Sequence, residues 1–222
     1  VFPLRSDIPS TILSSIDFSS DTVLSKLVLL KKSYGLNPDS FPPIILQSCA
    51  SSLAAPLAFL YNSFFTNSEL PSLWLSAIVI PLFKKGHSNL PSNYRPISLT
   101  SSCCKVMESI ISDAISEYLL SHHLLHDNQH GFHKNRSTLS NLLTSTHHWY
   151  ASLNSRKSTD VIYIDFAKAF DSVSHSKLLL KLRSYGISGD LFKFISAWLS
   201  GRTQSVLIDG VLSSPLAVLS GV

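Results

Sequence analysis

The chain has 222 residues, of which 45% are hydrophobic and 14% charged, and this balance excludes a disordered protein. Its net charge of +4 is mildly basic, which permits a polyanionic partner but does not require one. The three cysteines, two of them adjacent, exclude a disulfide framework and favour a reducing intracellular location, in the nucleus or the cytoplasm. We expect neither a membrane span nor secretion, because no apolar run approaches the required length of about 20 residues and no secretory leader opens the sequence.

Two helical stretches come first in the chain. Apolar residues recur at helical spacing over residues 20–33, where Asp21 could cap the start of the helix, and again over residues 43–67. Residues 35–40 between them are typical of a turn. Pro56 lies inside the second stretch and should kink or split it. We expect both stretches to form core helices without a chemical role.

A strand and a basic loop follow. Residues 73–83 are rich in β-branched residues and predict a strand, after which Lys84 and Lys85 open a polar loop that reaches Arg95. The proline after Arg95 biases that residue toward extended backbone, so its guanidinium can be aimed. Lysine supplies a point charge and arginine a bidentate fork, so the loop is suited to clamp a triphosphate. A solvated basic loop is the alternative.

Five histidines lie at and after the end of an amphipathic helix that is predicted over residues 101–121. Those at i, i+4 spacing would meet as zinc ligands if the segment were helical, but residues 127–129 and Gly131 interrupt a helix. A solvated loop therefore explains the cluster better than a metal site does. The five are His122, His123, His126, His130 and His133.

A second basic corner carries Lys134 and Arg136. It opens a helix that is predicted over residues 137–150 and that Ser137 or Thr138 can cap. The N-terminus of a helix favours anions, so this corner is a second candidate for binding phosphate.

The stretch from Val161 to Val173 is the chemical centre of the sequence. Four apolar residues with β preference lead into Asp165, and the pattern then becomes helical. A carboxylate held at the end of a strand suits a metal-dependent site, because Mg²⁺ tolerates little geometric slack. The alternative is an acid that only ends a strand, as aspartate often does.

The remaining residues predict two helices and a hairpin. Residues 176–185 form a helix that ends at Gly186, and residues 189–199 form another. Two alternating stretches then flank Asp209 and Gly210, which together are a strong hairpin signal.

The order of these motifs resembles the reverse transcriptases of non-LTR (LINE-type) retrotransposons. Each piece is weak alone, and the family is identified from their order and spacing over most of residues 25–222. The matching segments are Ile80-Pro-Leu-Phe-Lys-Lys-Gly86, Asn93-Tyr-Arg-Pro-Ile-Ser-Leu-Thr100, Cys104-Lys-Val-Met-Glu-Ser109, Asn128-Gln-His-Gly-Phe132 with Arg136-Ser-Thr138, Tyr163-Ile-Asp-Phe-Ala-Lys-Ala-Phe-Asp-Ser-Val173, Leu182-Arg-Ser-Tyr-Gly-Ile187, Trp198-Leu-Ser-Gly-Arg202 and Ser220-Gly-Val222.

The resemblance implies an α+β fold of the right-hand polymerase type, rich in helices and with a small antiparallel palm sheet. An N-terminal extension and the fingers would occupy residues 1–158, and the first, incomplete part of the palm would occupy residues 159–222.

The resemblance also implies roles for individual residues. Asp165 matches the first aspartate of the palm, which is catalytic and binds metal. The ring of Phe170 matches the position that screens out the ribose 2′-hydroxyl, and the backbone amides after Asp165, from Phe166 onward, would help to hold the triphosphate. The residues that would face the incoming nucleotide and the template from the fingers are Lys84, Lys85, Arg95 and Arg136.

A complete enzyme of this family is an RNA-directed DNA polymerase that takes an RNA template, a DNA primer and deoxynucleoside triphosphates. It uses two Mg²⁺ ions, with Mn²⁺ as the alternative, to clamp the attacking and leaving oxygens. Its other carboxylates come from a paired-aspartate hairpin after a Pro-Gln-Gly segment, and this sequence contains neither. Because the sequence also begins at Val1 without a methionine, we expect a fragment that is inactive alone. The alternative is a catalytically dead retroelement remnant that at most binds nucleic acid.

Overall fold

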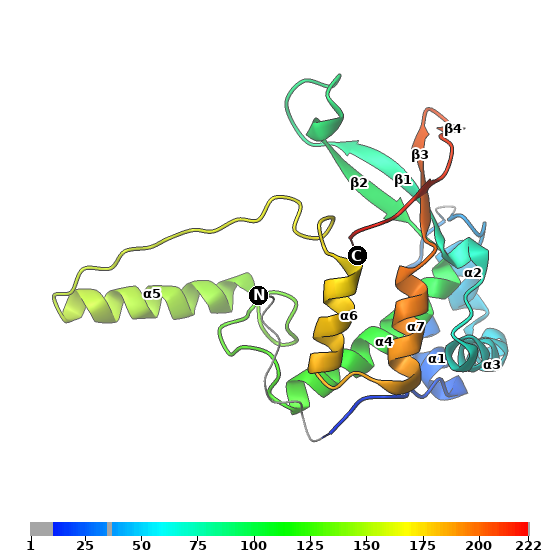
Figure 1. Cartoon of the computed structure of the whole chain (residues 1–222), viewed down its shortest axis with the longest axis horizontal. Coiled ribbons are helices and arrows are strands. Elements are labelled where there is room, and N and C mark those ends of the chain that lie inside the picture. Colours follow the sequence, from blue (N-terminus) through cyan, green and yellow to red (C-terminus); the bar gives the residue numbers. More distant parts are fainter. Residues whose placement is uncertain (1–10, 35–36, 222) are drawn as a thin grey trace. The chain divides into compact units, whose positions relative to one another are not determined.

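The computed structural model describes residues 11–34 and 37–221, which form two compact units (Figure 1). The first unit contains the described residues up to 118 together with those from 170 onward, and the second contains residues 119–169. Each unit is described by itself below.

Helices form most of the first unit, and most of them begin and end close to the predicted positions. The first helix begins at Ser20 as predicted but ends at Val28, short of residue 33, and Ser19 caps it rather than Asp21. Their buried residues lie three or four positions apart, as an amphipathic pattern requires; in one of them Ala54, Leu57, Tyr61 and Phe65 face the core. The helices are α1 (Ser20–Val28), α2 (Pro43–Ser48), α3 (Ala50–Asn67), α4 (Ser102–Ser121, whose last turn belongs to the second unit), α6 (His175–Ser184) and α7 (Gly189–Leu199).

The centre of this core is a group of aromatic rings. Phe18 is fully buried, and its ring centroid lies 6.0 Å from that of Tyr61 and 5.4 Å from that of Phe65. Phe65 also lies 5.5 Å from Phe194 of α7, so rings from three separate segments meet. Such ring pairs stabilise a fold by about 0.5–1.5 kcal/mol beyond their buried area.

The break between α2 and α3 lies at Cys49 and α3 continues through Pro56, so the prediction that Pro56 could split the second helical stretch is wrong. Proline removes one backbone donor and leaves the carbonyl of Ser52 without its helical partner. Both Ser52 and Pro56 are exposed, so water can satisfy that carbonyl and the helix continues.

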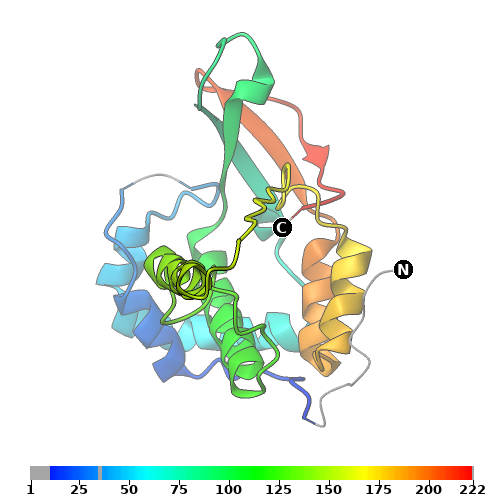
Figure 2. The same cartoon turned by 90° about the vertical axis from the view of Figure 1, so that its left-hand side faces the viewer.

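A mixed five-stranded sheet completes the first unit, with the strand order β2-β1-β3-β4 and β5 paired with β3 (Figure 2). The strand predicted over residues 73–83 is confirmed from Ser76 onward, while Ser72–Trp74 form a short 3-10 helix. The hairpin around Asp209 is confirmed, whereas β2 lies in a segment that was predicted to be a loop. The strands are β1 (Ser76–Phe83), β2 (Tyr94–Leu99), β3 (Thr203–Ile208), β4 (Val211–Leu212) and β5 (Leu216–Ala217).

We expected an antiparallel sheet, but the observed sheet is mixed. Its strands β1 and β3 run parallel, with Ser76 opposite Thr203. The other pairs, β1 with β2 and β3 with β4 and β5, are antiparallel. The chain between β1 and β3 passes through helices, and a crossover of this kind returns the chain to the sheet in its original direction.

A turn far away in sequence caps the start of α4. Asp39 accepts hydrogen bonds from the Ser101 hydroxyl at 2.6 Å and from the Ser102 backbone N–H at 3.1 Å, and Ser101 is fully buried. Asn37 donates to the Ser102 hydroxyl as well. The turn is confirmed for residues 37–40, where Ser40 N–H donates to the Asn37 carbonyl at 2.8 Å; residues 35 and 36 lie outside the described residues.

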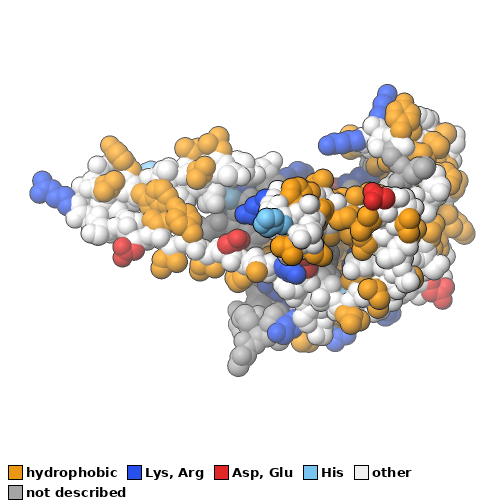
Figure 3. Space-filling model, turned by 90° about the horizontal axis from the view of Figure 1, so that it is seen from above, with side chains coloured by type: hydrophobic (Ala, Val, Ile, Leu, Met, Phe, Trp, Pro, Cys, Tyr) orange, Lys and Arg blue, Asp and Glu red, His pale blue; other side chains and the backbone are white. Residues whose placement is uncertain are grey.

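The second unit contains the helix α5 (Thr138–Asn154), which confirms the helix predicted from residue 137 onward. None of its described residues is buried. Hydrophobic side chains gather on the visible surface of α5 and the segment after it (Figure 3), and Leu139, Leu143 and Leu153 are each more than 60% exposed.

The strand predicted at residues 161–164 is wrong. Residues 157–166 have no regular secondary structure, and the side chains of Ile162 and Ile164 are 83% and 78% exposed. A strand must pair its backbone N–H and C=O groups with a neighbour, and no strand in the described part of the chain is paired with this segment. The apolar pattern alone therefore did not produce a strand here.

Asp39→Ala should destabilise the protein by about 1–2 kcal/mol, because it removes the carboxylate that caps α4 and leaves the buried Ser101 hydroxyl without its acceptor. Urea unfolding followed by circular dichroism should show a lower midpoint and an unchanged m value. Asp39→Asn keeps one acceptor oxygen and should cost less. Asp160→Ala, which changes an exposed acid in the irregular segment, is the matched control; equal midpoints for the Asp39 and Asp160 variants would contradict the capping role.

The three cysteines, which are all free thiols, should react in two classes. Burial, reinforced by the Asp39 carboxylate, raises the pKa of the half-buried Cys103 to about 11, and burial next to Glu108 raises the pKa of Cys104 still further. At pH 8 roughly one Cys103 thiol in a thousand would be thiolate, the reactive form, whereas Cys49 is exposed. A thiol reagent should therefore label one cysteine quickly in the native state and three after unfolding.

The variant Cys49→Ser supplies the control for this experiment, since it should lose the fast phase alone. If fast labelling of the native protein persists in Cys49→Ser, then Cys103 or Cys104 is accessible to the reagent and the expectation of two classes is wrong.

Candidate functional site

Three of the predicted cations lie on the hairpin formed by β1 and β2. Lys84 and Lys85 directly follow β1, and Arg95 lies in β2 opposite Leu82. Antiparallel pairing of the two strands from Ile78 to Phe83 therefore brings the two lysines and the arginine to the same end of one hairpin. The sequence analysis grouped these three residues in one phosphate-binding loop but did not predict the strand β2.

The loop that joins the two strands is held by its own side chains. The Lys84 backbone N–H donates to the Asn93 carbonyl at 2.8 Å, and the Asn93 side-chain amide donates to the His87 carbonyl at 2.8 Å. The Tyr94 hydroxyl donates to the Ser88 carbonyl at 2.8 Å. Gly86 has φ of +88°, and a Cβ there would lie 2.6 Å from the Asn93 amide, so a larger residue would disturb this loop.

The cations of the hairpin are exposed and face solvent. Three ion pairs in the described part of the chain join Lys26 with Asp113, Arg136 with Asp127 and Lys193 with Asp190, and none of these involves a hairpin cation. Lys84, Lys85 and Arg95 can therefore meet an external polyanion without first breaking an internal salt bridge.

Arg136 is placed differently. Its guanidinium donates to the backbone carbonyl of Asp127 and, at 3.2 Å, to that of Gln129, and it lies 3.9 Å from the Asp127 carboxylate. In this structure the side chain therefore fastens the loop before α5. Nothing in the sequence distinguished this internal use of the charge from the predicted contact with a nucleotide.

The start of α5 is capped by its own serines. Ser137 accepts from the Ser140 backbone N–H at 3.2 Å, and the Ser140 hydroxyl accepts from the Ser137 backbone N–H at 2.9 Å, which is a capping box. His130 Nδ1 lies 2.8 Å from the same Ser140 hydroxyl. The prediction of Ser137 as the cap is confirmed, while Ser140 was missed because a capping box usually has Glu or Gln at that position.

Asp165 and Phe166 lie on the irregular segment of the second unit, and both are exposed. They are neighbours in sequence. No group of three or more His, Cys, Asp or Glu side chains that could hold a metal ion occurs within the described residues. Of the histidines, His126 Nδ1 accepts from the Asn128 backbone N–H at 3.1 Å.

Phe170 opens the turn of residues 170–173 in the first unit. That turn lies against Ser220 and Gly221, and the Gly221 backbone N–H donates to the Val173 carbonyl at 2.9 Å. Local patterns in the sequence do not predict this contact, because nearly fifty residues separate the two segments.

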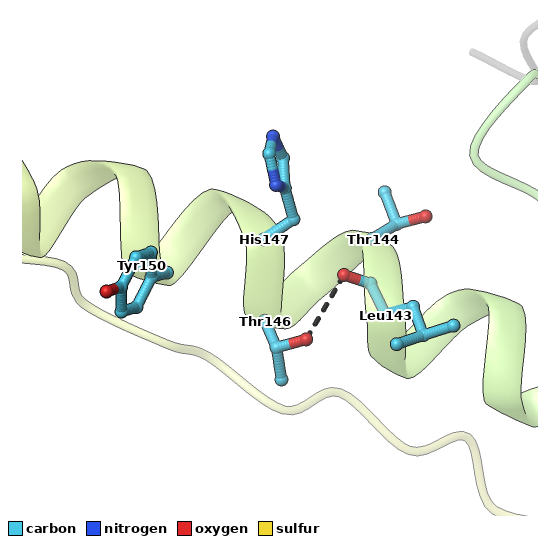
Figure 4. A pocket seen from close by; sticks show the side chains of 5 residues that line it. All are labelled: Leu143, Thr144, Thr146, His147 and Tyr150. Atoms are coloured by element: carbon cyan, nitrogen blue, oxygen red, sulfur yellow. Dashed lines mark hydrogen bonds between the residues drawn. The ribbon is translucent and has the colours of Figure 1, made fainter.

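Two hollows on the described surface contain none of the predicted site residues. One of about 700 Å³ lies on α5, where Figure 4 shows His147 and Thr144 on one side of the helix and Leu143 and Thr146 on the other, with Thr146 donating to the Leu143 carbonyl at 3.1 Å. Another, of about 460 Å³, lies between α4, α6 and α7 and is lined mainly by apolar side chains.

In the part of the chain that the structure describes, we find no helix with the length and apolarity needed to cross a membrane.

Comparisons with known proteins agree on one family. The family model described as "Reverse transcriptase (RNA-dependent DNA polymerase)" matches residues 83–218. The "Probable RNA-directed DNA polymerase from transposon BS" of Drosophila melanogaster is 27% identical over 198 residues, which cover 89% of this chain and 22% of that protein. The "RNA-directed DNA polymerase from mobile element jockey" of Drosophila funebris is 29% identical over 167 residues, which cover 75% of this chain and 18% of that protein.

A third relative is the "Retrovirus-related Pol polyprotein from type-1 retrotransposable element R2" of Popillia japonica, which is 28% identical over 140 residues, or 63% of this chain and 19% of that protein. The chain thus spans about a fifth of the length of these relatives. The resemblance to reverse transcriptases of non-LTR retrotransposons is confirmed. Since the family model matches more than half of its residues, the chain belongs to the reverse transcriptase (RNA-dependent DNA polymerase) family.

Proposed function

We propose that this chain supplies the fingers and the first part of the palm of a retrotransposon RNA-directed DNA polymerase, with residues 1–158 in the N-terminal extension and fingers and residues 159–222 in the palm. The observation that carries the proposal is the family match over residues 83–218, which begins at the hairpin with the exposed lysines. In such an enzyme the partners would be an RNA template, a DNA primer and deoxynucleoside triphosphates.

The basic hairpin would bind phosphate groups of the template or of the incoming nucleotide. Lys84 and Lys85 would act as point charges, and Arg95 would offer its planar fork to two phosphate oxygens at once. The ordered loop between β1 and β2 supports this role, because a loop fixed by internal hydrogen bonds loses less conformational freedom on binding. Phe170 would lie near the nucleotide sugar, and the backbone after Asp165, from Phe166 onward, near the triphosphate.

The metal chemistry of the family needs more than these residues provide. Mg²⁺ prefers oxygen ligands in octahedral geometry, and a two-metal site needs several carboxylates close together. Asp165 is a single exposed carboxylate, and the described residues include no metal-ligating cluster. The residues present therefore do not form the family's site by themselves, and Asp165 is proposed only as one ligand of it.

A catalytically inactive remnant that binds nucleic acid is the second candidate. The exposed cations of the hairpin favour it, since the basic hairpin needs no metal to bind a polyanion. Both candidates use the basic hairpin, but only the polymerase requires further metal-binding carboxylates besides Asp165. The reading frame that follows codon 222 distinguishes them: a frame that continues through a Pro-Gln-Gly segment to paired aspartates supports the polymerase, and an early stop supports the remnant.

Replacing Lys84, Lys85 and Arg95 with alanine should weaken binding of single-stranded RNA and make it less sensitive to salt. Each phosphate contact contributes about −0.7 to the slope of log K against log salt concentration for single strands, so three lost contacts should reduce the slope by about 2. Fluorescence anisotropy with a labelled RNA over a series of salt concentrations measures both quantities.

The matched control is the triple variant Lys31→Ala, Lys32→Ala and Lys157→Ala, which removes the same net charge from exposed positions elsewhere. If the two triple variants lose affinity and salt slope equally, the binding follows the net charge and the hairpin has no special role.

The 222-residue chain should not extend a DNA primer on an RNA template with Mg²⁺ and deoxynucleoside triphosphates, because one carboxylate cannot hold two metal ions. Denaturing gel electrophoresis of an end-labelled primer is the measurement, with a complete reverse transcriptase as the positive control. Extension by this chain that Asp165→Ala abolishes would overturn the expectation and establish a working site.

A further inference from the structure

Two segments far apart in sequence are joined by three hydrogen bonds, and we call this contact the clasp, formed by residues 171–175 and residues 220–221. The Gly221 backbone N–H donates to the Val173 carbonyl at 2.9 Å. The Ser220 hydroxyl donates to the Asp171 carbonyl at 3.0 Å, and His175 Nε2 lies 2.8 Å from the Gly221 carbonyl. Figure 1 shows the end of the chain beside the start of α6, where His175 begins the helix.

The clasp requires a glycine at residue 221. Gly221 is buried and has φ of +91°, which a residue with a side chain rarely adopts. A Cβ would also lie 3.1 Å from the Asp171 Cα and carbonyl oxygen and 3.3 Å from the Phe170 carbonyl oxygen. These are backbone atoms that cannot rotate away, so the two segments approach as closely as their main chains allow.

The third hydrogen bond of the clasp joins His175 to Gly221, and its donor can be assigned. The Gly221 carbonyl can only accept, so His175 must donate through an N–H at Nε2. The imidazole is half-buried, where a hydrogen bond is less exposed to competition from water. The helix α6 fixes the backbone of His175, because Ser174 caps that helix by accepting from the Lys177 backbone N–H.

The turn that the clasp holds is weak by itself. Its internal bond, from the Val173 backbone N–H to the Phe170 carbonyl, is long at 3.4 Å, and residues 161–172 are all exposed. The clasp therefore adds to this turn contacts that the turn's own hydrogen bond does not supply. Phe170, its first residue, is the one whose ring would lie near the nucleotide sugar.

We propose that His175 is a positioning residue: by donating to the Gly221 carbonyl, it holds Ser220 and Gly221 against the turn that begins at Phe170 and so fixes where Phe170 stands. The placement of Phe170 near the nucleotide rests on the proposed function, whereas the clasp itself does not. Position 175 therefore needs a side chain with an N–H donor that extends as far from the backbone as the imidazole Nε2 does.

Amide hydrogen exchange of the 222-residue chain, followed by NMR, tests the clasp directly. His175→Phe keeps a ring of similar size and removes the donor, and exchange at the Gly221 amide should then become about tenfold faster, as expected for the loss of one hydrogen bond. His175→Gln restores a donor and should recover most of the protection. Unchanged exchange at Gly221 in His175→Phe would overturn the proposal.

A pair of glycine variants separates the close approach from backbone strain. Gly221→Ala and Gly210→Ala both place a side chain at positive φ, +91° and +80°, but a Cβ at Gly210 meets nothing within 4 Å. Gly221→Ala should expose the turn of residues 170–173 to exchange, while Gly210→Ala should leave that turn protected. Equal effects of the two variants would mean that strain alone, rather than contact with the turn, explains the need for glycine.

Binding of dATP and ATP to the wild-type chain and to His175→Phe, measured by calorimetry with Mg²⁺, tests the consequence for the nucleotide. We expect His175→Phe to reduce the preference for dATP several-fold and to change the affinity for dATP less, because the basic hairpin is untouched. An unchanged preference would show that the clasp does not position Phe170 for the sugar. If the wild-type chain binds neither nucleotide, the proposed function fails for this chain, and the exchange experiment still decides whether the clasp exists.

Discussion

The parallel pairing of β1 with β3 is the constraint on which the arrangement of the first unit depends. It joins Ser76 to Thr203 across 127 residues, and the two side-chain hydroxyls lie 3.3 Å apart. On one side of this pair, β2 continues the sheet and presents the basic hairpin. On the other side, β3 carries β4 and β5, and the chain after β5 reaches the turn at Phe170. Both parts of the candidate site in this unit are thus attached to the same pair of strands.

Much of the fold followed from local patterns in the sequence. The helices α1, α3, α4 and α7 show apolar residues at helical spacing, and the turn at Asp209 and Gly210 depends only on its own residues. The parallel pairing could not be predicted in the same way, because it depends on a partner more than a hundred residues away. The same reason explains the error at residues 161–164, where strand-forming residues are paired with no strand in the described part of the chain.

The sequence predicted those parts of the candidate site whose chemistry depends on the charge of single residues. Lys84, Lys85 and Arg95 are exposed on one hairpin, in keeping with a role that needs only charge and access. The family relationship was readable from the order of short motifs. The contacts that individual side chains make could not be predicted. The sequence showed a basic residue at Arg136 but not the loop carbonyls to which it donates. It also gave no reason to expect that His175 contacts the Gly221 carbonyl.

The bridge between the N-terminal segment and the end of α6 bears on the order in which this protein can fold during synthesis. Leu13 N–H donates to the Gly186 carbonyl, and Ser188 N–H donates to the Leu13 carbonyl, each at 3.0 Å, so Leu13 acquires its partners only after residue 188 has been made. At a synthesis rate of about 5–20 residues per second, the interval is on the order of ten seconds or more. Throughout it α1 and α3 lack α7, which completes their core, and the aromatic rings around Phe18 stay partly open to solvent and to chaperones.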